Sequence, residues 1–273
     1  MRLLRSMRFR QLGLLAAGIV LSAAAPARAD ISFSLAPMTC EIEAKPGSQT
    51  TGTLLVSHDV PDGKKAKDIA PLILRLYTAD WSLDRKGNPI FAKPGTIPGS
   101  ASAWIKVNPV NLTIPAGEKS EVRYTVDVPQ GAQGTFRSVI MFESAPAPRT
   151  DGDRVITING RIGATLYVHA GPQSKRARIS AFTVTPETSV LTVENTGSSH
   201  VRLKGQLQFR DESGKMVQQV DLPGGVVLPG EPNVREVSVA TPKLPAAGIY
   251  TVTAVLDYGG EVLIGARSKV TIP

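Results

Sequence analysis

The stretch LTIPAGEKSEVRYTVDVPQGAQGTFRSVIMFE, residues 112–143, decides the fold class. A Pro-Ala-Gly turn at residues 115–117 precedes an alternation of apolar and polar residues over 121–128, and a second apolar run covers 136–143. This period-two alternation indicates half-buried β-strands, because successive side chains of a strand point to opposite faces. Residues 112–143 therefore predict two strands joined by a proline- and glycine-rich connection.

Segments of the same kind fill the rest of the chain after residue 30. The 25 glycines and 21 prolines are spread along 273 residues and divide them into short runs rich in Val, Ile and Thr. Further strands are expected at residues 53–57, 72–78, 104–107, 155–168, 189–194, 201–210, 216–222, 234–240, 250–258 and 261–272. No segment after residue 30 has the pattern of an amphipathic helix. The sequence therefore predicts an all-β protein of two immunoglobulin-like β-sandwich domains.

The domain boundary is expected in the polar, turn-prone segment 170–176, which follows the long predicted strand. This gives an N-terminal domain over residues 30–170 and a C-terminal domain over 171–273. The proline-rich segment 144–154 is interpreted as a long loop inside the first domain, because strong strand patterns flank it on both sides.

Residues 1–29 have the composition of a cleaved signal peptide. A basic start is followed by an uncharged apolar run over residues 12–25 and by the small-residue site Ala27-Arg28-Ala29. The apolar run is shorter than the roughly 20 residues that a membrane-spanning helix needs. Removal of 1–29, which holds five arginines and no acid, leaves 26 basic and 23 acidic residues, a net charge of +3. The mature chain is therefore expected to be exported, not membrane-spanning, and not a nucleic-acid-binding protein.

Residues suited to catalysis, disulfide formation or metal binding are few. The single cysteine, Cys40, cannot form an internal disulfide and is expected to be a small buried side chain. The three histidines, His58, His169 and His200, are not spaced with one another or with a carboxylate as metal ligands are. No nucleotide-binding or nucleophile motif is present. We expect no enzyme activity, no cofactor and no metal site.

Residues 112–143, together with the upstream strand pattern WIKVNP at 104–109, resemble the N-terminal domain of periplasmic pilus-assembly (fimbrial) chaperones. The resemblance covers about residues 31–170, and the C-terminal half is similar to bacterial immunoglobulin-like or fibronectin type III-like domains. It implies a periplasmic protein that binds and caps pilus or surface-fibre subunits by β-strand addition, and that also meets an outer-membrane assembly protein.

In that family the last strand of the N-terminal domain is lent to the bound subunit. Here this implies a donor strand within residues 155–168, with Ile156, Ile158 and Ile162 on one face as partner-binding residues. The residue pattern alone leaves open an ordinary sandwich strand whose apolar face meets its own core.

The chain departs from the family at its basic anchor pair, an arginine and a lysine that bind the subunit's C-terminal carboxylate. The arginine position falls near Thr39, and Gly163 stands where the lysine is expected. Arg161 is the basic group available on that strand and is the candidate carboxylate anchor.

Two other functions remain open at this stage. One is a non-catalytic structural or adhesive surface protein of immunoglobulin-like modules. The other is a secreted enzyme or carbohydrate-binding module that uses Asp80, Trp81 and Asp84, for which the competing interpretation is a hairpin with a buried tryptophan.

Overall fold

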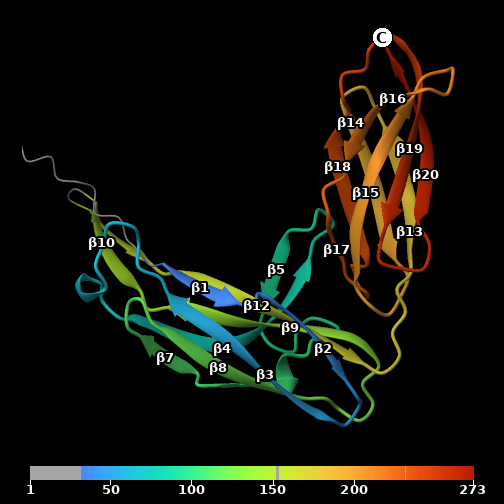
Figure 1. Ribbon diagram of the computed structural model, residues 1–273. Coiled ribbons are helices and arrows are strands. Elements are labelled where there is room, and N and C mark those ends of the chain that lie inside the picture. The colour runs from blue at the N-terminus through green and yellow to red at the C-terminus, as the bar shows by residue number, and fades with distance from the viewer. Residues whose placement is uncertain (1–31, 152–153, 231) are drawn as a thin grey trace, which may run out of the picture.

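A computed structural model of the chain describes residues 32–151, 154–230 and 232–273 (Figure 1). The predicted signal peptide, residues 1–29, lies outside the described residues. The described ranges are built of β-strands and two short 3-10 helices, η1 Ala66–Asp68 and η2 Ser102–Trp104, so the predicted all-β class is confirmed. No helix in these ranges is long and apolar enough to cross a membrane.

The first β-sandwich is formed by described residues between Phe33 and Ala170. Its strands are β1 Phe33–Ala36, β2 Thr39–Ala44, β3 Gln49–His58, β4 Leu72–Leu83, β5 Pro89–Ala92, β6 Ile105–Asn108, β7 Asn111–Ile114, β8 Lys119–Asp127, β9 Gly134–Ser144, β10 Ala147–Asp151, β11 Arg154–Ile158 and β12 Arg161–Ala170.

Two sheets face each other in this sandwich. One has the strand order β1-β3-β8-β6, and the other has the order β2-β12-β9-β4-β5 with β7 also paired to β4. β10 and β11 form a separate two-stranded hairpin. The chain changes sheets between β1 and β2 at Pro37, a residue with no backbone N–H to give to a ladder.

The alternation that predicted the strands is the alternation that fills the core. In β8, Val122, Tyr124 and Val126 are buried, whereas Glu121 and Arg123 between them are exposed. The buried side chains of both sheets form one apolar cluster, which contains Leu54, Leu74, Ile140, Phe142 and Leu166. Cys40 is buried in the same cluster, as predicted.

The second β-sandwich follows. Its strands are β13 Ala177–Val184, β14 Thr188–Asn195, β15 Val201–Arg210, β16 Met216–Asp221, β17 Gly225–Val227, β18 Val234–Ala240, β19 Gly248–Asp257 and β20 Ile264–Ile272. The sheets have the orders β13-β14-β18 and β16-β15-β19-β20, with β17 paired to β15. A separate apolar cluster, which includes Leu207 and Phe209, fills this sandwich.

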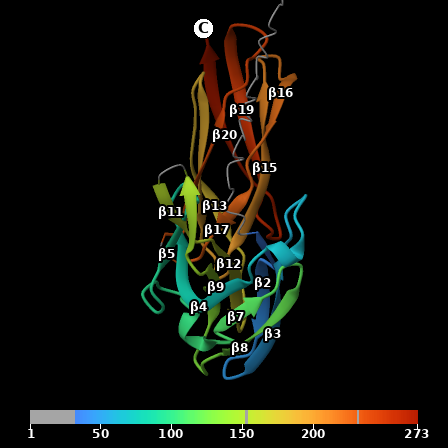
Figure 2. The same ribbon diagram turned by 90° about the vertical axis from the view of Figure 1, so that its left-hand side faces the viewer.

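The two sandwiches meet at one end and form an L, with the β10–β11 hairpin at the far end of the first one (Figures 1 and 2). A third apolar cluster lies at the junction and brings Trp81 and Tyr167 of the first sandwich against Leu228 of the second. Arg85, in the turn between β4 and β5, forms an ion pair with Glu236 of β18 at 3.0 Å. The outer face of the β12-β9-β4 sheet therefore supports the second sandwich.

Candidate partner-binding site

One edge of β12 is paired with another strand over only part of its length. β9 pairs with the whole of β12, from Arg161 opposite Glu143 to Ala170 opposite Gly134. β2 covers the other edge only from Thr165 onward, because the chain crosses to the facing sheet before Thr39. Residues 161–164 therefore have a strand partner on one side and none on the other within the described residues.

The unpaired edge continues into the projecting hairpin. β11 pairs with β10, from Arg154 opposite Asp151 to Ile158 opposite Ala147, and with no further strand in the described ranges. The expected loop over residues 144–154 thus contains a strand, β10. Pro148 is tolerated in β10 because the strand has a neighbour on one side only.

The predicted strand 155–168 is interrupted at residues 159–160. Gly160 N donates to Ser144 Oγ at 2.8 Å, and Ser144 N donates to the Gly160 carbonyl at 2.8 Å. Three residues on the β9–β10 side, 144–146, lie opposite two on the β11–β12 side. One extra residue on one strand is the defining feature of a β-bulge. The edge therefore consists of two strand segments, β11 and the start of β12, joined by a bend.

The three predicted donor residues are divided between these segments. Ile162 is half-buried and packs against the core of the first sandwich, and Leu166 further along β12 is fully buried there. Ile158 is half-buried at the end of β11. Ile156 lies opposite Arg149 in the backbone register, and its side chain is outside the described part of the chain.

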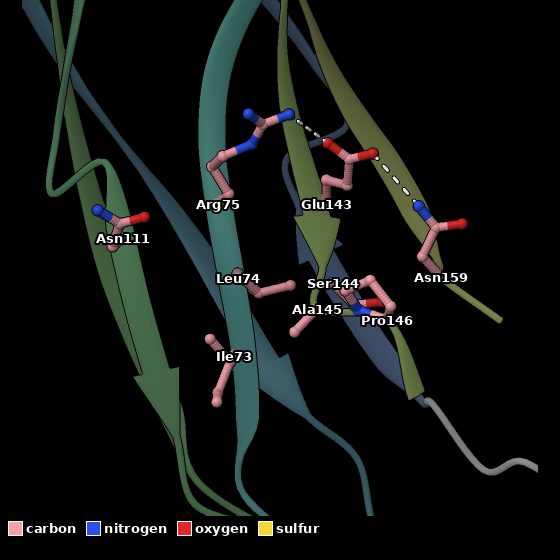
Figure 3. Close-up of a pocket in the computed structure, with 9 residues that line it drawn as sticks. All are labelled: Ile73, Leu74, Arg75, Asn111, Glu143, Ser144, Ala145, Pro146 and Asn159. Atoms are coloured by element: carbon pink, nitrogen blue, oxygen red, sulfur yellow. Dashed lines mark hydrogen bonds and ion pairs between the residues drawn. The ribbon is translucent and has the colours of Figure 1, made fainter. Parts of the chain in front are cut away.

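Arg161 lies at the open end of β12, in a charged cluster. Its Nη1 donates to Tyr77 Oη at 3.4 Å. The neighbouring Glu143 accepts from Arg75 Nη2 at 2.8 Å and from Asn159 Nδ2 at 3.3 Å (Figure 3). The Arg75 guanidinium holds the pKa of Glu143 below its ordinary value.

A surface groove beside this cluster is lined by Ile73, Leu74, Arg75, Asn111, Glu143, Ser144, Ala145, Pro146 and Asn159 (Figure 3). Arg161 and this groove are some nine residues of extended strand, roughly 30 Å, from the end of β12 that leads to the second sandwich. Arg161 is thus a residue of the open edge and not of the cleft between the sandwiches.

Gly163, which the resemblance aligns with the lysine of the anchor pair, lies where a side chain would clash with its neighbours. A Cβ at Gly163 would lie 2.6 Å from Val139 Cγ2 and 3.2 Å from Met141 Sδ, so no side chain fits between these residues. Thr39, near which the resemblance places the arginine of that pair, is paired with Thr165 at the start of the β2–β12 ladder.

A cluster of ionisable side chains, Glu41, His169, His200 and Arg202, lies in the cleft between the sandwiches, and sequence reasoning missed it. The carboxylate of Glu41 in β2 accepts from Arg202 Nη2 at 2.6 Å, and it lies 2.8 Å from His169 Nε2 and 3.3 Å from His200 Nε2. Burial alone would raise the pKa of Glu41, but the hydrogen bonds from His169, His200 and Arg202 outweigh it and hold that pKa well below the ordinary value. No short sequence spacing could reveal these residues, since Glu41 and His169 are 128 positions apart.

Asp80 and Trp81 have a structural role. Asp80 is buried, and its carboxylate accepts from Thr96 N at 2.7 Å, Ile97 N at 2.8 Å and Ser102 Oγ at 2.6 Å. Burial works to raise the pKa of Asp80, and these hydrogen bonds lower it overall. Trp81 is buried at the junction, so the buried-tryptophan interpretation is correct.

A scan against protein-family models finds no match, and no curated protein matches the sequence. Several solved structures are similar to the chain. One chain of a chaperone–tip adhesin complex of CFA/I fimbriae biogenesis has 15% identity and a TM-score of 0.49, over 88% of this chain and 98% of that one. The class 5 fimbriae chaperone CfaA has 14% identity and a TM-score of 0.47, over 89% and 100%.

A chain of the CsuC-CsuE chaperone–tip adhesion subunit pre-assembly complex, from archaic chaperone-usher Csu pili of Acinetobacter baumannii, has 15% identity and a TM-score of 0.46, over 88% of this chain and 98% of that chain. These structures come from fimbrial chaperones and their complexes.

Proposed function

We propose that the chain is a periplasmic chaperone that binds and caps pilus or surface-fibre subunits by β-strand addition. The observation that carries this proposal is the unpaired edge formed by β11 and residues 161–164 of β12. An exposed edge presents a row of free N–H and C=O groups that pair readily with another chain. An incomplete subunit would have an open edge of its own that is prone to aggregate. Pairing of the chaperone edge with the subunit edge would protect both.

The side chains along this edge support an apolar contact with the partner. Ile158 is not part of the core cluster that Ile162 joins, which leaves Ile158 available to fill a groove in a subunit. From Ile162 onward, the strand packs against the core of the first sandwich. We propose that Ile156, Ile158 and Ile162 form the partner-binding row, with Ile158 at its centre.

Arg161 is proposed as the residue that holds the partner's terminal carboxylate. Its guanidinium is exposed, and within the described residues its hydrogen bond is one long contact with Tyr77. An arginine has five N–H donors, so a carboxylate can form a charge-assisted pair with it. The nearby Glu143 already pairs with Arg75, which reduces its competition for Arg161.

The remaining assignments follow from the sequence pattern and the resemblance. Residues 1–29 are proposed to direct export to the periplasm, the chain is proposed to divide into domains at residues 170–171, and the protein is proposed to be non-catalytic. Pilin-like subunits are the proposed partners, and an outer-membrane assembly protein is proposed to receive the loaded complex.

The test is a pull-down from periplasmic extract with the tagged protein, its Ile158→Asp variant and an Ile249→Asp control. Ile249 is an exposed isoleucine in a strand of the second sandwich, 45% accessible, so its replacement adds the same charge away from the edge. Mass spectrometry should identify small pilin-like subunits with the wild type and the control, and their loss with Ile158→Asp. Equal capture by all three proteins would exclude strand addition at this edge and favour a structural or adhesive surface module.

A further inference from the structure

Two histidines and a glutamate from distant parts of the chain converge in the cleft between the sandwiches. Glu41 lies on β2, His169 on the adjacent strand β12, and His200 immediately before β15 of the second sandwich. One ligand atom from each of the three lies within 4.8 Å of the others. Both histidines are at least nine-tenths buried.

The position of the proton on His169 is fixed by a chain of hydrogen bonds behind it. The two hydrogens of the Gln173 amide nitrogen are shared among three backbone carbonyl oxygens, 3.1 to 3.3 Å from that nitrogen, so Oε1 is the atom that faces Thr135. Thr135 Oγ1 gives its single hydrogen to Gln173 Oε1 at 2.8 Å. The same hydroxyl can therefore only accept from His169 Nδ1, 3.0 Å away, and His169 carries a proton on Nδ1.

This tautomer has a consequence on the other side of the ring. Neutral His169 with a proton on Nδ1 turns a bare Nε2 lone pair toward the Glu41 carboxylate, 2.8 Å away. Two lone pairs in contact repel, so a positive centre has to lie between them, either a second proton or a metal ion. A histidine whose Nδ1–H is held by a neighbouring acceptor and whose Nε2 is free is the arrangement found at metal ligands.

The second histidine is held in a compatible position. The His200 ring stacks on Tyr167 at a centroid distance of 4.0 Å and lies 5.6 Å from the His169 ring. Its Nδ1 has no hydrogen-bond partner among the described residues, so no neighbour fixes its tautomer. His200 Nε2 can donate to Glu41 or offer a lone pair to a cation.

We propose that Glu41, His169 and His200 form a binding site for a divalent transition-metal ion of the Zn²⁺ class. Two imidazole nitrogens and one carboxylate oxygen suit Zn²⁺, with a water in the fourth position, whereas Mg²⁺ and Ca²⁺ prefer oxygen ligands. Metal–ligand distances of about 2.0–2.2 Å place tetrahedral ligand atoms roughly 3.3 Å apart. The 2.8 Å between His169 Nε2 and Glu41 Oε2 then has to open by a few tenths of an ångström.

Arg202 is the competitor for this site. Its guanidinium donates to Glu41 Oε1 at 2.6 Å and neutralises the carboxylate, and its side chain is about half exposed, so it can turn toward solvent. A bound ion would link β2 and β12 of the first sandwich to the second one through His200. The site would thus control how firmly the two sandwiches are joined, independently of whether the protein is a chaperone.

The test is Zn²⁺ titration by calorimetry on metal-stripped full-length protein purified after export with a histidine-free tag, with Co²⁺ absorption as a second readout. We expect one Zn²⁺ per chain, at least about 100-fold weaker binding in His169→Gln and His200→Gln, and unchanged binding in Glu43→Gln, a carboxylate that lines the same cleft. Arg202→Gln should bind Zn²⁺ more tightly, because the competing cation is gone.

Circular dichroism in EDTA checks that each variant is folded, and Glu41→Gln carries the test if a histidine variant is not. The Co²⁺ complex should show the visible absorption of a four-coordinate site with nitrogen ligands. The proposal is overturned if the wild type binds no Zn²⁺ at micromolar concentration, in which case a proton occupies the position between His169 and Glu41. It is equally overturned if both histidine variants bind Zn²⁺ as the wild type does.

Discussion

Aspartate at Ile158 and aspartate at Ile162 should affect stability very differently, although the two positions are four residues apart. Ile162 is half-buried against the core of the first sandwich. Its replacement forfeits about half of the 1.5–3 kcal/mol that full burial of an isoleucine contributes. A polar group set against the core without a hydrogen-bond partner adds about 1–3 kcal/mol, and at this half-buried position the carboxylate stays partly in water. Ile162→Asp should therefore lower the free energy of unfolding by about 2–4 kcal/mol, and Ile158→Asp, outside that cluster, by less than about 1 kcal/mol.

Urea denaturation followed by tryptophan fluorescence measures this difference, because both tryptophans, Trp81 and Trp104, lie in the first sandwich. With a denaturant slope of about 2 kcal/mol per molar urea, the midpoint should fall by about 1–2 M for Ile162→Asp and by less than about 0.5 M for Ile158→Asp. If Ile158→Asp lowers the midpoint as far as Ile162→Asp does, Ile158 is a core residue and the reasoning about an open edge is wrong.

Three further predictions concern the framework around the site. Phe142→Ala should lower the free energy of unfolding by about 3–5 kcal/mol, because Phe142 is fully buried. In the same urea assay, Phe91→Ala should change it by less than about 1 kcal/mol, because Phe91 is 48% exposed. Similar losses for the two variants would contradict the assigned core. Asp80→Ala should lower the free energy of unfolding by about 2–4 kcal/mol, because it leaves two backbone N–H groups of the 93–102 segment without their acceptor. An unchanged melting temperature would show that this carboxylate does not hold the segment. The pKa of Glu41 is lowered on folding, so its stabilising contribution is present above about pH 4.3, the pKa of an unfolded glutamate, and is lost as pH falls below it. Melting temperatures of the wild type and Glu41→Gln, measured without added metal, should therefore differ at pH 6 and approach each other at pH 3, and a gap that widens at pH 3 would refute the sign.

The fold class could be predicted because period-two burial is a local property of the sequence. Val122, Tyr124 and Val126 alternate with charged residues, and that alternation alone places them in a core. β13 was not predicted because a register shift between Ile179 and Ala181 breaks its alternation. β5 and β7, short strands of four residues each, were not predicted either.

The candidate edge was predicted in part. The apolar alternation of residues 155–168 is visible in the sequence, but the bend at 159–160 depends on Ser144, whose hydroxyl accepts from Gly160. β10 was interpreted as a loop because its segment is polar and proline-rich; Pro148 would be excluded from a central strand but is tolerated in a strand with one neighbour.

The cleft cluster could not be predicted from spacing. Glu41 meets His169 because β2 pairs in parallel with β12, a pairing that brings together the two ends of the first sandwich's chain. His200 and Arg202 join them only once the second sandwich is placed on the first. Each of these contacts is a property of the topology, and none leaves a motif in the sequence.

Amide hydrogen exchange of the protein, free and in complex with a captured subunit, tests the central claim most directly. Strand addition at the open edge should slow the exchange of amides in residues 154–164, which have free N–H groups to pair. Residues 165–170, already paired on both sides, should change little. Protection confined to another surface, with unchanged exchange over 154–164, would contradict the account.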